Sequence, residues 1–205
     1  MNTKTAEQLK RWSAPTSRAK IDSPRGDYKY GIHNKKFAQA LGELVGQWTR
    51  VEEEMIAILR ILLGGERNAP AREIFNSLVS ERVRYDLMKL LLEQTPINRN
   101  REPVYDEVLT EFWSLRGIRN DYVHGLWATH ECGKVFLSLK STDDSFYLRQ
   151  RHVSLNQMTH EAKRMRELTQ KILVIEIQER RQRLRARRGE SSPGTPPPLV
   201  DGKSI

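Results

Sequence analysis

Residues 35–63 read KKFAQALGELVGQWTRVEEEMIAILRILL, and this stretch decides the fold class. Its apolar residues recur at steps of three and four, which is the spacing of one face of an α-helix. Gly64 and Gly65 follow, and glycine favours the end of a helix. We therefore expect one long amphipathic helix in a mainly α-helical domain. Its apolar positions are Phe37, Leu41, Leu44, Val45, Trp48, Val51, Met55, Ile58, Leu59 and Leu62.

Two further stretches, 71–94 and 103–124, have the same periodicity. Pro70 suits the first turn of a helix, and Ser80 can divide the first stretch into two helices, since serine favours a cap over a helix interior. The side chains expected to face inward are Ile74, Phe75, Leu78, Val79, Leu87, Leu90 and Leu91 in the first stretch, and Tyr105, Val108, Leu109, Phe112, Trp113, Leu115, Ile118, Tyr122 and Val123 in the second.

The periodicity changes after Gly125. Val135, Leu137 and Leu139 alternate with other residues, 146–153 is rich in strand-forming residues, and 141–145 (STDDS) is typical of a turn. This predicts an inserted β-hairpin at about 126–153, or a three-stranded meander if 126–131 forms another strand. A last helix of roughly 50 Å is expected over 154–188. Its inward positions are Leu155, Met158, Ala162, Met165, Leu168, Ile172 and Ile175.

The two ends of the chain differ from its middle. Residues 1–32 mix proline, serine, glycine and charges without a period, which predicts a flexible basic arm. Residues 33–188 form the expected helical domain with its β insertion. Residues 189–205 contain four prolines and no amphipathic face, which predicts a disordered Pro-rich tail.

Composition excludes several classes of protein. A single cysteine, Cys132, rules out an intramolecular disulfide framework and a cysteine-based zinc finger. No apolar run approaches the roughly 18 residues that a membrane span needs, and the N-terminus has no apolar signal region. We expect a cytoplasmic protein without membrane contact or cofactor. His130 and Cys132 are only two possible metal ligands, so no metal site is expected.

The positive charge is concentrated at the ends. The net charge is +9, and both 1–36 and 180–188 carry +6. Clustered cations attract phosphate polymers, which predicts RNA binding by the last helix. The same charges could instead only keep the protein soluble, and charge alone leaves both readings open. The arginines concerned are Arg180, Arg181, Arg183, Arg185, Arg187 and Arg188.

Residues 116–127 read RGIRNDYVHGLW and carry the strongest chemical signal. At 100° per residue, Asn120 and His124 share a face, and the long Arg119 side chain can reach the same helix end. A guanidinium suits phosphate binding, and an imidazole suits proton transfer. The alternative is a plain C-cap at His124, with Arg119 and Asp121 as a surface ion pair.

The segment Arg119–His124 (RNDYVH) resembles the R-x4-H signature of HEPN domains, including an asparagine directly after the arginine. The resemblance covers roughly 35–126 and extends to Trp48, Glu52–Glu54 and the F-x-S-L pattern at Phe75–Leu78. Glu52–Glu54 form a solvated face or turn one carboxylate to Arg119. The resemblance implies an antiparallel helical bundle and a metal-independent endoribonuclease of a toxin–antitoxin or anti-phage system.

It also implies roles for individual residues. Arg119 would stabilise the scissile phosphate, His124 would transfer a proton as the RNA 2′-hydroxyl attacks, and Asn120 would orient either His124 or the phosphate. Such domains pair with the two motifs facing each other, and an antitoxin or defence-system partner is expected. Leu126 stands where nucleotidyltransferase-controlled relatives often have tyrosine. The alternative function is a non-catalytic helical module that binds nucleic acid or a protein.

Overall fold

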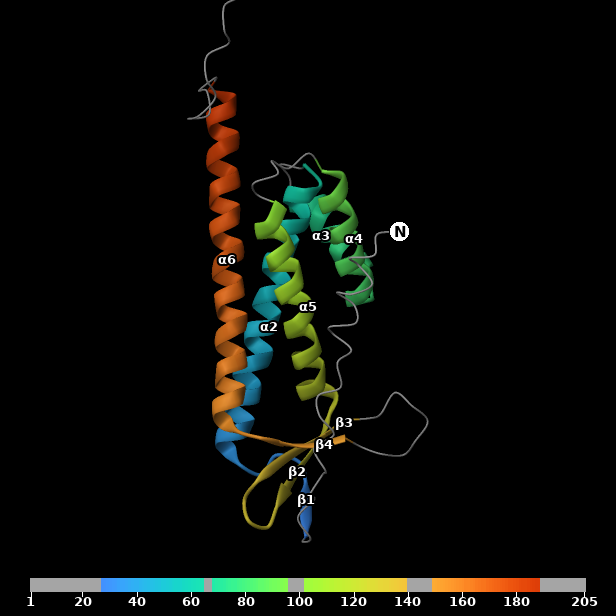
Figure 1. The fold of residues 1–205 in the computed structure, drawn as a ribbon, viewed down its shortest axis with the longest axis vertical. Helices are drawn as coiled ribbons and strands as arrows, with labels where there is room; N and C mark the ends of the chain where they lie inside the picture. The colour runs from blue at the N-terminus through green and yellow to red at the C-terminus, as the bar shows by residue number, and fades with distance from the viewer. Residues whose placement is uncertain (1–26, 65–67, 96–101, 140–148, 189–205) are drawn as a thin grey trace, which may run out of the picture. The chain divides into compact units, whose positions relative to one another are not determined.

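The computed structural model describes residues 27–64, 68–95, 102–139 and 149–188. These residues form five helices and a four-stranded antiparallel sheet, so the expected mainly α-helical fold with a small β insertion is confirmed (Figure 1). In chain order the elements are β1 (Tyr28–Tyr30), α2 (Lys35–Leu62), α3 (Asn68–Ser77), α4 (Glu81–Gln94), α5 (Glu102–His124), β2 (Leu126–His130), β3 (Val135–Leu139), β4 (Arg149–Val153) and α6 (Leu155–Arg187).

The chain divides into two compact units. Of the described residues, those within 27–33 and 125–153 form the sheet unit, and those within 34–124 and 154–188 form the helical unit. The predicted turn at 141–145, most of the predicted arm and the predicted Pro-rich tail lie outside the described residues.

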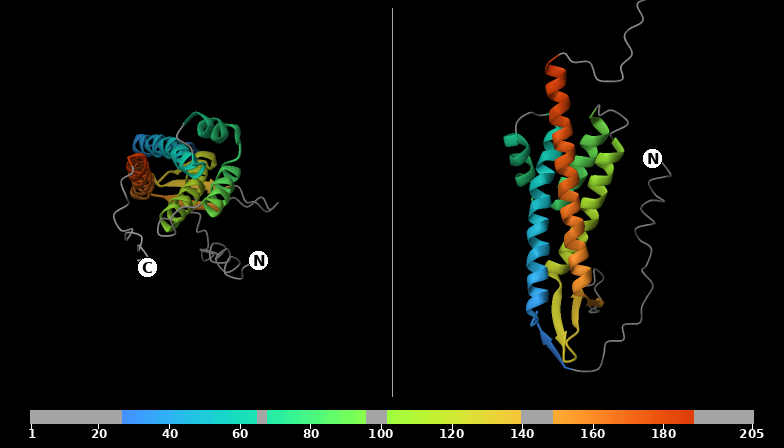
Figure 2. Two further views of the ribbon diagram at one scale, coloured as in Figure 1. Left: turned by 90° about the horizontal axis from the view of Figure 1, so that it is seen from above. Right: turned by 90° about the vertical axis from the view of Figure 1, so that its left-hand side faces the viewer.

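In the helical unit, α2 and α6 run side by side in the same direction (Figure 2). Glu43 pairs with Arg166 at 2.8 Å near one end, and Arg60 pairs with Glu176 at 2.6 Å near the other. Helix α5 runs the opposite way. The expected antiparallel bundle thus contains one parallel pair, α2 and α6. Helix α5 returns the chain to the end of the bundle at which α2 begins, and α6 begins at that same end.

The core of the helical unit lies between α2, α5 and α6. Trp48 stacks on Phe112 with ring centroids 5.2 Å apart and an interplanar angle of 15°. Both rings are buried, and offset stacking of this kind adds to the free energy of burial. Helix α6 buries six of its seven predicted inward positions: Met158, Ala162, Met165, Leu168, Ile172 and Ile175.

Some predicted inward positions are wrong. Val79 is 94% exposed because the helical pattern is interrupted before it, and it lies between α3 and α4. Leu90 is exposed on the outer face of α4, and Val45 and Val123 are exposed as well. Although α2 and α6 contain 28 and 33 residues, no helix in the described ranges is apolar enough over a sufficient length to cross a membrane.

Helix boundaries follow local capping chemistry. The second predicted stretch is divided before Ser80, as expected, and Ser80 occupies the N-cap position of α4 without a side-chain capping bond. Ser154 caps α6, where its hydroxyl oxygen accepts a hydrogen bond from the Gln157 amide at 3.1 Å. Asn34 similarly caps α2 by accepting from the Lys36 amide at 3.0 Å.

In the sheet unit, four strands are hydrogen-bonded in the order β1-β2-β3-β4. The register aligns Tyr30 with Ala128, Ala128 with Phe136, and Phe136 with His152. Strand β1 lies within 1–32, where the sequence predicts a flexible arm and no strand. Tyr28 packs edge-on against His130 and Phe136, with ring centroids at 5.0 and 5.8 Å, so contacts distant in sequence hold this short strand.

Candidate functional site

The three predicted catalytic residues lie in the last two turns of α5, in the helical unit. Arg119 Nη1 donates a hydrogen bond to Oδ1 of Asn120 at 2.7 Å, and both side chains are half-buried. His124 is the last residue of α5 and is exposed. The structure thus brings Arg119 and Asn120 together, while no hydrogen bond or ion pair in the described part of the chain joins His124 to either of them.

A carboxylate from α4 adjoins this pair. Glu81 accepts a hydrogen bond from Arg116 Nε at 2.7 Å and a longer one from Asn120 Nδ2 at 3.5 Å. Its other oxygen is 3.7 Å from Arg119 Nη1. Glu81 is only 16% exposed, so it provides a fixed negative charge among two guanidinium groups and an amide. No pattern in the sequence points to Glu81, since nothing local links the start of α4 to the end of α5.

A second carboxylate comes from α2. Glu52 accepts a hydrogen bond from Arg84 Nη1 at 3.2 Å, and the Arg84 side chain is 15% exposed. Burial and the nearby Glu81 carboxylate raise the pKa of Glu52, while Arg84 and Arg119 act to lower it. Of the three consecutive glutamates, Glu52 is therefore the one that interacts electrostatically with Arg119.

The arrangement presents guanidinium groups able to bind a phosphate, and the exposed imidazole of His124 lies one helical turn beyond Asn120 on α5. The Arg119 Nε is buried and has no hydrogen-bond partner among the described residues. The Arg116 guanidinium lies over the Trp113 ring at 4.5 Å, which fixes its plane. An anionic ligand at Arg119 must compete with Glu81 for the same guanidinium.

The six predicted RNA-binding arginines form two rows along the end of α6. Arg180, Arg183 and Arg187 line a groove of about 450 Å³. Arg181, Arg185 and Arg188 are exposed and are not among the residues that line this groove. The remaining lining residues are Arg60 and Ile61 of α2 and Glu176, Glu179 and Leu184 of α6.

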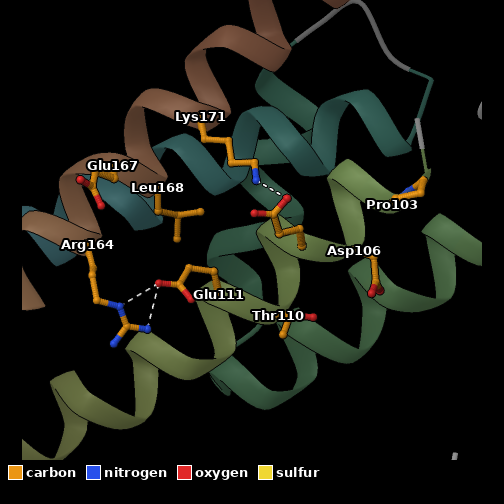
Figure 3. Close-up of a pocket in the computed structure, with 9 residues that line it drawn as sticks. Pro103, Asp106, Thr110, Glu111, Arg164, Glu167, Leu168 and Lys171 are labelled. Carbon is orange, nitrogen blue, oxygen red and sulfur yellow. Dashed lines mark hydrogen bonds and ion pairs between the residues drawn. The ribbon is translucent and has the colours of Figure 1, made fainter. Parts of the chain in front are cut away.

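Another groove, of about 540 Å³, lies between α5 and α6 (Figure 3). Its cations are already paired: Arg164 lies 2.9 Å from Glu111, and Lys171 pairs with Glu107. Asp106 and Glu167 add two more carboxylates to its lining. This surplus of negative charge disfavours RNA, so we do not assign the groove to the candidate site.

His130 and Cys132 lie in the sheet unit. The Sγ of Cys132 is 2.8 Å from Nδ1 of His130, and the amide of Cys132 also donates to that nitrogen at 3.2 Å. The described residues contain no cluster of three or more side chains of the kind that could hold a metal ion. The contact between His130 and Cys132 is therefore explained as a local turn interaction.

Comparison of the chain with models of known protein families, with curated proteins and with solved structures gives no match. The resemblance to HEPN domains therefore rests on the residues of this chain alone, above all on Arg119–His124.

Proposed function

We propose that this chain is a metal-independent endoribonuclease of the HEPN type, acting in a toxin–antitoxin or anti-phage system in the cytoplasm. The observation that supports it best is the end of α5, where Arg119 and Asn120 are hydrogen-bonded and His124 is exposed one turn later. A guanidinium that binds phosphate and an imidazole that moves a proton are the groups that RNA cleavage without a metal requires.

In the proposed reaction the 2′-hydroxyl oxygen of RNA attacks the adjacent phosphorus. The hydroxyl proton passes to a base, the new O2′–P bond forms, and the P–O5′ bond breaks as the leaving 5′ oxygen takes up a proton. The products are a 2′,3′-cyclic phosphate and a 5′-hydroxyl. Arg119 stabilises the charge that develops on the phosphate, His124 performs one of the two proton transfers, and Asn120 holds Arg119 in position.

One histidine cannot be base and acid at the same moment. We therefore propose a homodimer in which the motifs of two copies face each other, so that His124 of each copy takes one of the two roles. A protein that remained monomeric throughout the concentration range in which it cleaved RNA would contradict this part of the proposal.

The direct test is cleavage of cellular RNA and tRNA in the presence of EDTA. The wild type should cleave and His124→Ala should not, while both keep the same circular dichroism spectrum. His160→Ala is the matched control, because His160 is also an exposed histidine of the helical unit. It should cleave at the wild-type rate. Cleavage by His124→Ala at that rate would refute the proposal.

A second candidate function is a non-catalytic helical module that binds nucleic acid or a protein. It is favoured by one observation: Glu81 engages Arg116, Arg119 and Asn120, so these groups already have a structural role. This function predicts salt-sensitive RNA binding that is lost when 180–205 are deleted, without any cleavage. Unchanged binding after that deletion would argue against its nucleic-acid form.

A further inference from the structure

The predicted catalytic residues and the arginine-lined groove lie at opposite ends of α5. Tyr105, in the first turn of α5, donates a hydrogen bond to Glu179, which lines the groove. His124 is the last residue of the same helix. With a rise of about 1.5 Å per residue, the helix separates Tyr105 from His124 by about 28 Å. A single phosphate cannot contact both places.

The groove has an excess of positive charge. Four arginines and two glutamates line it, and one of the arginines, Arg60, comes from α2. Arg60 is 16% exposed and pairs with Glu176 at 2.6 Å, and its Nε is buried without a hydrogen-bond partner among the described residues. Burial and the ion pair with Glu176 fix this guanidinium, so an RNA phosphate must compete with Glu176 for it, while the three arginines of α6 keep the net charge of the lining positive.

The three arginines of α6 in the groove follow helical spacing. Arg180, Arg183 and Arg187 differ by three and four positions and so share one face of α6. Arg181, Arg185 and Arg188 form a second row with the same spacing and the same charge, rotated away from the groove. The two rows carry the same charge, so charge alone does not distinguish them. They differ in position, because only the row of Arg180, Arg183 and Arg187 lines a groove together with Arg60.

We propose that the groove formed by Arg60, Arg180, Arg183 and Arg187 is a second RNA-binding site, which holds the phosphodiester backbone remote from the cleavage site. This inference rests on the proposed function, because it assigns the same substrate to both places. At about 3.4 Å per nucleotide along a helical strand, the separation corresponds to roughly eight nucleotides. An extended single strand spans the same distance with fewer nucleotides, so a 16-nucleotide RNA can bridge both places, whereas a 4-nucleotide RNA reaches one of them only.

The first experiment measures binding without cleavage. Full-length protein is titrated into a fluorescent 20-nucleotide RNA whose 2′-hydroxyls are all methylated, and the Kd is obtained from anisotropy over a range of salt concentrations. Two triple variants are compared: Arg180→Gln with Arg183→Gln and Arg187→Gln, and Arg181→Gln with Arg185→Gln and Arg188→Gln. Each loses three charges, and glutamine preserves helix propensity.

The groove triple should raise the Kd at least about tenfold and should reduce the slope of log Kd against log salt by about 2, as expected for loss of three contacts to a single strand. The other triple should raise the Kd at most about threefold. Equal losses in the two triples would overturn the proposal, since charge alone would then explain binding. Failure of the wild type to bind this RNA at low salt would also overturn it.

A second pair of variants guards against misfolding of a triple. Leu184 lines the groove, so Leu184→Glu places a carboxylate among the arginines. Ala186→Glu adds the same charge at an exposed position that does not line the groove. Leu184→Glu should weaken binding by several-fold more than Ala186→Glu. Equal effects would contradict the proposal.

Cleavage provides a separate readout. With a 16-nucleotide substrate, the groove triple should raise KM and leave kcat unchanged, and with a 4-nucleotide substrate neither value should change. Groove-dependent binding by a wild type that does not cleave would refute the proposed function and support the RNA site. If the groove triple and the wild type cleaved with the same KM on both the 16-nucleotide and the 4-nucleotide substrate, the proposed RNA site in the groove would be refuted, while the proposed function would stand.

Discussion

Arg119 Nη1 lies 3.7 Å from Oε1 of Glu81 and donates its hydrogen bond to Asn120 instead. Glu81 accepts its short hydrogen bond from Arg116, at 2.7 Å. In this arrangement, Glu81 supplies a negative charge at the guanidinium to which the proposed function assigns the RNA phosphate. Under the proposed function, the phosphate must compete with Glu81 for Arg119, and the consequence can be measured.

Glu81→Gln should change stability and RNA affinity in opposite directions. Loss of the charge leaves the half-buried Arg116 without its ionic partner, which should reduce the free energy of unfolding by about 1–3 kcal/mol. It also removes the competitor of the phosphate, so the Kd for 2′-O-methyl RNA should fall several-fold. Denaturant unfolding and anisotropy give the two quantities.

The control for this variant is Asp86→Asn, on the same helix. Asp86 pairs with Arg82 at 2.7 Å, and both side chains are more than half exposed. This change should alter the free energy of unfolding by less than about 1 kcal/mol, since exposed pairs contribute little. If Glu81→Gln had no larger effect on either quantity than Asp86→Asn, Glu81 would have no special role at this site.

Stability should depend on pH through Glu52. Its pKa in the folded chain is raised, chiefly by burial, above the value of 4.5 for a solvated glutamate. The folded state therefore holds this proton more tightly than the unfolded state does, so stability is full below about pH 4.5 and declines as the pH rises through the folded pKa. The glutamine in Glu52→Gln does not titrate. The free energy of unfolding of this variant, relative to that of the wild type, should therefore increase as the pH rises from about 4.5 through the folded pKa of Glu52.

The measurement is urea unfolding at several pH values between 4 and 7. The pKa of Glu54 is also raised by burial, so the wild-type curve contains both contributions, and the difference between variant and wild type isolates Glu52. Glu167→Gln, at an exposed ion pair with Lys163, should follow the wild-type curve. A constant difference between Glu52→Gln and the wild type at every pH would contradict the prediction.

Two identical substitutions on α6 should differ strongly in effect. Ile172 is fully buried, and Ile172→Ala should lower the free energy of unfolding by about 2–5 kcal/mol through lost burial and a cavity. Ile177 is 50% exposed, and Ile177→Ala should change it by about 0.5 kcal/mol or less. Similar losses at the two positions, measured by thermal or denaturant unfolding, would mean that α6 buries a different face.

The two serine N-caps should also differ. Ser154 accepts a hydrogen bond from the Gln157 amide, so Ser154→Ala should lower the free energy of unfolding by about 1 kcal/mol. Ser80 makes no side-chain capping bond, and Ser80→Ala should cost less than about half of that. An equal cost for the two changes, in the same unfolding assay, would show that the hydrogen bond at Ser154 is not the cause.

Much of the secondary structure was predictable because it depends on interactions between residues close in the chain. The helix over 35–62, the division before Ser80 and the start of α6 after Ser154 follow from apolar spacing and capping within a few residues. Strand β1 was not predictable, since three residues do not define a period and Tyr28 is held by His130 and Phe136, which are distant in sequence.

The candidate site shows the same division. Sequence by itself determined that Arg119, Asn120 and His124 lie near the end of one helix, because residues one to five positions apart are placed by the helix itself. Only the tertiary structure decided that Glu81 of α4 adjoins Arg119, that Arg60 of α2 meets one row of the arginines of α6, and that this groove adjoins the end of α5 opposite to His124. These relationships depend on how helices pack and in which direction each runs, and no local pattern encodes the direction of a helix relative to a distant one.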